Sequence, residues 1–171
     1  WMMEKHPKSR ITEIRLQSDV ALAIRLPVDR REWLDHVRAH RQLILDAWES
    51  DALGREWTEV LSQPTPAAIH LYRHDAPMLS FQCTRSSLYA RTAYAYLIAV
   101  EGKRDDSLKI VLPELLAWQH LQRSEGMLVH QMIAAVMIKE SMKTIDAILD
   151  LGPASPTTLE AVRGALDTAY P

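Results

Sequence analysis

Histidines supply the clearest pattern with which this sequence could do chemistry. His36 and His40 form an H-x-x-x-H pair, and His70 and His74 repeat that spacing. Residues four apart share one face of a helix, so two imidazoles can approach a common metal ion. A zinc site needs about four ligands, or three with an open position. The two pairs together would therefore suffice for a metal site.

Charge next to the first pair opposes that interpretation. Arg38 and Arg41 flank it, and their positive charge disfavours a divalent cation. The sequence also lacks the H-E-x-x-H arrangement, in which a glutamate would serve as general base. We therefore expect no metal site and no cofactor. A metal-binding protein or metal-assisted hydrolase that uses the four histidines above is the alternative.

The sequence contains residue types that could serve nucleophilic or acid–base catalysis, but no motif that arranges them. Cys83 could act with His70 or His74 as base and Asp75 as orienting group. No nucleophile elbow surrounds this cysteine, and a free cysteine is usually a small buried hydrophobe. The acidic groups that could form carboxylate pairs are Glu101 with Asp105 and Asp106, and Glu114 with Glu125. Solvation of helix ends explains these groups better, so we expect no catalytic residue.

Composition limits the classes of protein to which the chain can belong. Its 171 residues are 47% hydrophobic, which suits one domain with its own core. Five glycines and no asparagine leave few residues for the turns of an all-β fold. A net charge of −2 disfavours a nucleic-acid binder, and the single cysteine excludes an internal disulfide. Phosphate-binding glycine loops are absent, which excludes nucleotide binding in those modes.

The sequence predicts no membrane-spanning helix. Its longest apolar run, Ala93 to Val100, falls short of the about 20 residues that a bilayer requires. The sequence begins with Trp1 rather than methionine, which suggests a fragment that a tag, signal peptide or membrane anchor precedes. Both a cytoplasmic protein and the extracytoplasmic domain of a membrane-tethered protein fit this pattern.

Hydrophobic periodicity predicts an all-α fold of about six helices in a single domain. Capping by Asp29 and a three- and four-residue apolar spacing predict a helix from Arg30 to about Ser50. Alternating residues predict an extended or irregular segment before it. The remaining expected elements are helices at 51–63, 84–101, 105–123, 126–150 and 156–169, with a proline-containing loop at 64–80 that joins sub-layers 1–63 and 81–171.

Glycines and prolines punctuate the second half. Gly102, Gly126 and Gly152 follow periodic segments, where a residue with positive φ ends a helix. Ser155 and Pro156 are suited to cap and open the last helix. Pro113 falls inside a predicted helix, so that helix either kinks or restarts there. The segment 126–150 is apolar on almost every side near its middle, which predicts that it is the central helix of antiparallel hairpins.

A stretch within this half resembles a tetratricopeptide helical hairpin. The match covers about 34 positions, about 84–118, and the residues that carry it run from Leu88 through the tyrosine-rich segment to Leu116. Ala95 and Ser107 would be the small residues that allow close packing, and Gly102 the turn. Arg91 replaces an expected aromatic, and Pro113 precedes the usual terminal proline. A looser likeness over 84–150 is to uncharacterised bacterial helical proteins, which implies no activity.

An exposed aromatic surface is the expected functional feature. Arg85, Tyr89 and Tyr96 share one helix face, and Trp118 lies on the next helix. Arginine and aromatic residues are enriched in protein interfaces. We therefore expect a non-catalytic interaction or scaffold module that binds a protein partner or a second copy of itself.

Overall fold

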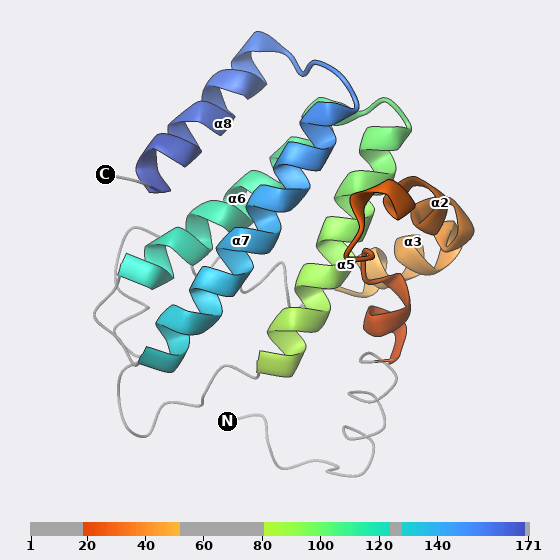
Figure 1. Ribbon diagram of the computed structural model, residues 1–171, viewed down its shortest axis with the longest axis horizontal. Helices are drawn as coiled ribbons and strands as arrows, with labels where there is room; N and C mark the ends of the chain where they lie inside the picture. Colours follow the sequence, from red (N-terminus) through yellow and green to blue (C-terminus); the bar gives the residue numbers. More distant parts are fainter. Residues whose placement is uncertain (1–18, 52–80, 124–127, 170–171) are drawn as a thin grey trace.

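The computed structural model describes residues 19–51, 81–123 and 128–169. Every regular element in these ranges is a helix, with no strand among them, which confirms the predicted all-α class. The helices are η1 (Arg30–Glu32), α2 (Trp33–Ala39), α3 (Arg41–Ser50), α5 (Phe81–Val100), α6 (Arg104–Arg123), α7 (Leu128–Asp150) and α8 (Pro156–Ala169). In Figure 1, α5 to α8 alternate in direction, and α2 and α3 lie against α5.

The segment before η1 differs from the prediction. Residues 19–24 are helical rather than extended. Ala21 and Ile24 are buried, whereas Leu22 is 53% exposed. A strand would have placed Leu22 and Ile24 on one face, so the three-residue spacing of the buried positions follows the helix and overrides the alternation in the sequence. Residues 1–18 lie outside the described residues.

The predicted helix over 30–50 begins where expected but is interrupted. The side chain of Asp29 accepts a hydrogen bond from the backbone nitrogen of Arg31 at 3.0 Å, which caps η1. His40 separates α2 from α3 with φ −107° and ψ 19°. Its backbone nitrogen and Nδ1 each lie 3.0 Å from the carbonyl oxygen of His36. The side chain thus competes for a backbone acceptor at the point where α2 ends.

Helices α5 and α6 form the hairpin that the sequence predicts at 84–123. Gly102 has φ +91°, and the backbone nitrogen of Lys103 donates to the carbonyl of Ile98 at 2.9 Å. This is the left-handed helix end that favours glycine. The buried hydroxyl of Ser107 donates to the carbonyl of Ala95 at 2.6 Å. The two small residues therefore sit where the helices approach closely, as predicted.

Helix α6, rather than α7, takes the central position among the described helices. It contacts α5, α7 and α8, and ten of its residues are buried. Pro113 lies inside α6, which continues through it without restarting. This proline is exposed, so the carbonyl that loses its intrahelical partner can face water. The expectation that 126–150 is covered on several sides is wrong for its N-terminal half, as described below.

The turn between α7 and α8 is fastened to the start of α6. Gly152 has φ +139°, and the Arg104 guanidinium donates to the carbonyl of Leu151 at 2.8 Å. Ser155 caps α8 by accepting from the backbone nitrogen of Thr158, as predicted. The backbone nitrogen of Ser155 in turn donates to Asp105 at 2.9 Å, and this bond lowers the pKa of the Asp105 carboxyl. Gly126 and the segments 52–63 and 64–80 lie outside the described residues.

The core contains residues from α2, α3 and α5 to α8, together with Ile24 from the helical segment 19–24. Its largest fully buried side chains are Trp33, Ile24, Ile44, Leu88, Leu108, Leu115, Leu121, Met137 and Ile148. Within the described ranges, no helix combines the length and apolar character that crossing a membrane would require.

Candidate functional site

The four residues of the predicted interaction surface divide into two groups. Tyr96 and Trp118 are buried, with 6% and 5% of their surface exposed. Tyr96 packs edge-on against Trp33 at a ring-centroid distance of 5.1 Å. Arg85 and Tyr89 are half-buried and lie together, with the guanidinium carbon 5.8 Å from the ring centroid. In this fold, only Arg85 and Tyr89 of the four are accessible to a partner.

A second arginine, from a distant part of the sequence, also lies near the Tyr89 ring. The guanidinium carbon of Arg25 lies 5.2 Å from the Tyr89 ring centroid. An arginine near an aromatic face is attracted by the negative charge density of the ring. Two guanidinium groups therefore gather at one ring on α5, and they form a small basic site that the sequence did not predict.

A buried ion pair joins α5 to α6. The Nε atom of Arg91 lies 3.6 Å from Oε2 of Glu114, and the two side chains are only 7% and 5% exposed. The indole nitrogen of Trp118 donates to Oε1 of Glu114 at 3.4 Å. Burial raises the pKa of the Glu114 carboxyl, and Arg91 and Trp118 offset part of that increase. On the other side, the Arg91 guanidinium carbon lies 5.8 Å from the Trp48 ring centroid.

This pair links two helices through buried charged side chains. A buried ion pair fixes how two helices align, and removal of one partner leaves a charge without compensation. The sequence had one signal for it, since Arg91 interrupts an apolar helix at a position where the hairpin pattern expects an aromatic residue. Glu114 had been considered only with Glu125, which lies outside the described residues.

The first histidine pair comes together, as its spacing predicts. The rings of His36 and His40 have centroids 4.4 Å apart and planes 32° apart. Burial lowers the pKa of His36, and the neighbouring His40 lowers it further. Nε2 of His36 is buried and has no hydrogen-bond partner among the described residues. His70 and His74 lie outside the described residues, so the meeting of the two pairs stays a prediction.

The other candidate chemical groups have structural partners or lie partly outside the description. Cys83 is in α5, while its proposed partners at 70–75 are not described. Glu101 binds the Arg41 guanidinium at 3.0 Å, and Asp106 binds Lys109 at 3.1 Å. Across the described part of the chain, no three histidine, cysteine, aspartate or glutamate side chains are grouped so that they could hold a metal ion.

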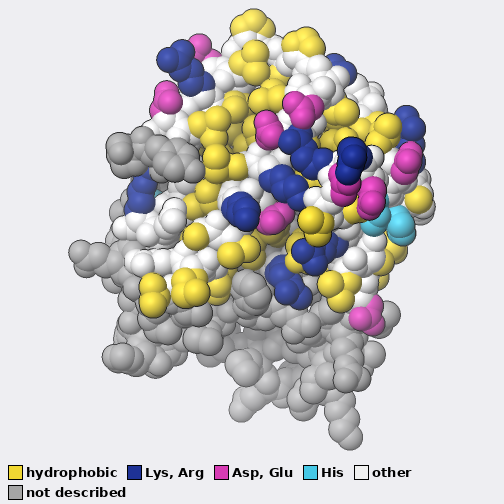
Figure 2. All heavy atoms as spheres, in the orientation of Figure 1, with side chains coloured by type: hydrophobic (Ala, Val, Ile, Leu, Met, Phe, Trp, Pro, Cys, Tyr) yellow, Lys and Arg dark blue, Asp and Glu magenta, His cyan; other side chains and the backbone are white. Residues whose placement is uncertain are grey.

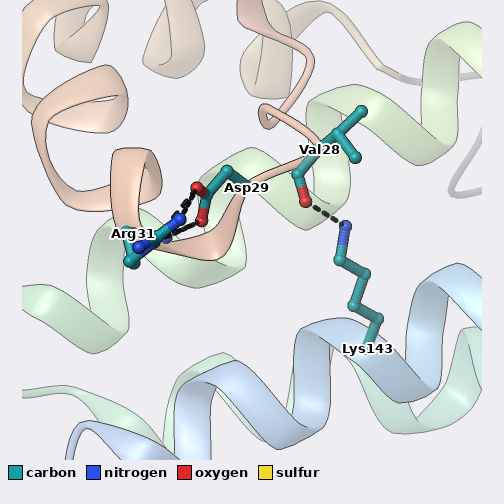
Figure 3. Close-up of polar contacts among 4 residues, drawn as sticks. All are labelled: Val28, Asp29, Arg31 and Lys143. Atoms are coloured by element: carbon teal, nitrogen blue, oxygen red, sulfur yellow. Dashed lines mark hydrogen bonds and ion pairs between the residues drawn. The ribbon is translucent and has the colours of Figure 1, made fainter.

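One half of the outward face of α7 is covered by the segment around η1. Arg30 bridges two α7 carboxylates, with its nitrogens 2.7 Å from Asp146 and 2.5 Å from Asp150. The Lys143 ammonium donates to the carbonyl of Val28 at 3.3 Å, as Figure 3 shows. The same ammonium lies 5.1 Å from the Trp33 ring centroid. These contacts tie the C-terminal half of α7 to residues from the first part of the chain, although the Asp146 and Asp150 side chains stay largely exposed.

The other half of this face is open and apolar. Leu128, Met132 and Val136 have 71%, 62% and 50% of their surface exposed. They occur every four residues, so they form one stripe along α7. In Figure 2, hydrophobic side chains extend over the part of the surface where α7 lies. We call these three residues the apolar stripe.

The chain has no detectable relative in three comparisons. No family model matches it, no curated protein resembles it significantly, and no solved structure shows a significant similarity. The resemblances to a tetratricopeptide hairpin and to uncharacterised bacterial proteins therefore gain no support from known proteins. The helical hairpin itself rests on the geometry of α5 and α6.

Proposed function

We propose that this protein is a non-catalytic interaction module whose contact surface is the apolar stripe of α7. The supporting observation is the exposure of Leu128, Met132 and Val136 at four-residue intervals. Single exposed apolar residues are ordinary, whereas a contiguous exposed stripe is typical of an interaction site. Helices with this spacing commonly bind an amphipathic helix of a partner.

A photo-crosslinking experiment in the native host tests this function. A photoreactive residue at position 132 should form an adduct with a partner protein or a second copy of the chain. The same residue at position 22 is the matched control, because Leu22 is similarly exposed but lies away from α7. The substitution Val136→Glu should abolish the adduct at 132. Equal adducts at both positions, or no adduct at 132, would contradict the proposal.

The alternative function is metal binding by His36 and His40 together with His70 and His74, because a zinc site needs at least three ligands and the structure describes the first pair alone. The contact between the rings of the first pair supports it, and the ion pair of Arg41 with Glu101 reduces the positive charge that opposes a cation. Added zinc should then raise the melting temperature of the protein. His36→Gln should remove that increase, whereas His120→Gln, a change at an exposed histidine on α6, should not. An unchanged melting temperature in zinc would exclude this function.

A further inference from the structure

The methionines of α7 differ in their access to solvent. Met132 has 62% of its surface exposed, whereas Met137 is fully buried and Met142 half-buried. The three side chains are five residues apart, so each is rotated by about 140° from the last around a helix of 3.6 residues per turn. Met132 therefore points away from the core that Met137 helps to form. A reagent in solution can reach the Met132 side chain without any opening of the fold.

The neighbours of Met132 on this face give its side chain little cover. Leu128 and Val136, about one turn before and after it, are 71% and 50% exposed. Ala135, three residues further along α7, is also exposed. Met132 is the central residue of the apolar stripe, so its chemical state decides whether the stripe is apolar along its whole length.

A methionine thioether reacts with hydroperoxides. The sulfur donates an electron pair to one peroxide oxygen, a sulfur–oxygen bond forms, and the oxygen–oxygen bond breaks. The sulfur is thereby oxidised by two electrons. The second oxygen takes up the proton of the transferred one and leaves as water or an alcohol, so the hydroperoxide is reduced. The product, methionine sulfoxide, is polar and is returned to methionine by sulfoxide reductases.

We propose that Met132 is a site of reversible oxidation by hydroperoxides, and that its oxidation turns the apolar stripe into a polar surface. A partner that covered the oxidised side chain would have to remove water from the sulfoxide oxygen. Burial of a polar group without a hydrogen bond is costly, so apolar contact with the stripe would weaken. This proposal rests on the proposed interaction function and adds a chemical signal that controls it.

Hydrogen peroxide treatment of the folded protein tests where oxidation occurs. We expect Met132 to take up oxygen at least about tenfold faster than Met137, because the fold shields the buried thioether from solvent. Tandem mass spectrometry assigns the added oxygen to each methionine. The same treatment in concentrated urea should bring the two rates together, since unfolding exposes both sulfurs. Equal rates in the folded protein, or faster oxidation of Met137, would overturn the proposal.

Binding of the dye anilinonaphthalene sulfonate tests what oxidation does to the stripe, because this dye reports exposed apolar surface. Peroxide should weaken dye binding by the parent about threefold. Met132→Leu keeps the stripe apolar without a sulfur, so peroxide should leave its dye binding unchanged. Met132→Gln should bind the dye weakly before any treatment. The matched control, Met142→Leu, removes a half-buried methionine of the same helix and should respond to peroxide as the parent does.

The comparison of the parent with Met132→Leu decides the proposal. Unfolding would raise dye binding, so a fall cannot come from a loss of structure. An equal fall in the parent and in Met132→Leu would overturn the proposal, because it would assign the effect to another residue. Unchanged dye binding by the oxidised parent would overturn it as well.

Photo-crosslinking separates this proposal from the interaction function. With the photoreactive residue at position 128, peroxide treatment of the native host should remove the adduct of the parent and spare that of Met132→Leu. An adduct that persists on the oxidised parent would overturn the control by oxidation. Absence of an adduct before any peroxide would contradict the interaction function alone, since the peroxide and dye measurements decide the oxidation site by themselves.

Discussion

The two halves of the outward face of α7 differ in what covers them. At the C-terminal half, Arg30 binds two carboxylates, and Lys143 lies under Trp33. At the N-terminal half, the apolar stripe is half exposed or more. The segment around η1 thus contacts the polar half, although Asp146 and Asp150 keep 69% and 70% of their side-chain surface exposed, whereas the apolar half is open. Burial of hydrophobic surface alone would favour a contact on the apolar half instead.

The physical reason lies in the covering residue rather than in the ion pairs. Trp33 is only 2% exposed, and its indole nitrogen donates to the carbonyl of Pro27 at 2.7 Å. Burial of a tryptophan contributes far more than an exposed ion pair, for which measured values are about 0.2–1 kcal/mol. Of the residues that contact this half of α7, we therefore expect Trp33 to contribute the most to stability.

The largest test of this comparison is Trp33→Ala. We expect the free energy of unfolding to fall by about 3–5 kcal/mol, because the change leaves a cavity against Tyr96 and uncovers α7. Met132→Ala on the open half should change it by about 0.5 kcal/mol or less. Urea unfolding curves measure both. Similar losses from the two substitutions would remove the distinction between the halves.

A second test asks whether buried charge, rather than apolar cover, holds the helices together. Glu114→Ala should lower the free energy of unfolding by about 3–5 kcal/mol, because it removes the Glu114 carboxylate from the buried Arg91 guanidinium. The double substitution Arg91→Met with Glu114→Leu should restore most of the loss, since it replaces the pair by apolar volume. Chemical denaturation of the three proteins measures this. A double variant as unstable as the single one would show that the pair itself is essential.

A third test addresses the exposed ion pairs of the covered half. Arg30→Ala removes contacts to Asp146 and Asp150, and we expect a loss of only about 0.2–1 kcal/mol per pair. Because exposed charges are screened, the loss should shrink further in high salt. Thermal unfolding at two salt concentrations measures both effects. If Arg30→Ala lowered the free energy of unfolding as much as Trp33→Ala, the ion pairs rather than the indole would hold η1 against α7.

The smallest expected effect is a dependence on pH at His36, on the helix that carries Trp33. Burial lowers the pKa of His36 below its ordinary value of 6.5. The unfolded chain therefore binds a proton at a higher pH than the folded one, and stability present above 6.5 is lost as the pH falls below it. Unfolding curves between about pH 8 and about pH 5 should show this loss. His36→Gln should have a flatter dependence, and an unaltered slope in that variant would contradict the role of His36.

Local features of the fold were predictable from the sequence. The start of the helical segment at Asp29, the helix end at Gly102 and the cap at Ser155 each depend on one residue and its neighbours, and all three are confirmed. The interruption at His40 and the helix at 19–24 were not predicted. At His40, the side chain competes for the carbonyl oxygen of His36. At 19–24, burial of Ala21 and Ile24 favours a helix over the extended segment that the alternating residues predict.

The candidate site was less predictable than the fold. The sequence predicts Tyr96 and Trp118 at an interaction surface, but both side chains are buried. Trp33 packs against Tyr96, and Glu114 accepts a hydrogen bond from the indole nitrogen of Trp118. The apolar stripe was expected inside because α7 is apolar on nearly all sides. Periodicity indicates which face of a helix is apolar, but it does not indicate which neighbour covers that face.

The amino-acid sequence alone is enough to predict that this chain is helical and where several of its helices begin and end. These properties follow from backbone conformations and spacings within a few residues. The packing of distant segments is needed to place α6 at the centre, to bring Arg91 to Glu114 and to leave half of one face of α7 exposed. Those outcomes depend on which distant segments pack together, and many pairings of apolar helix faces satisfy the same local pattern.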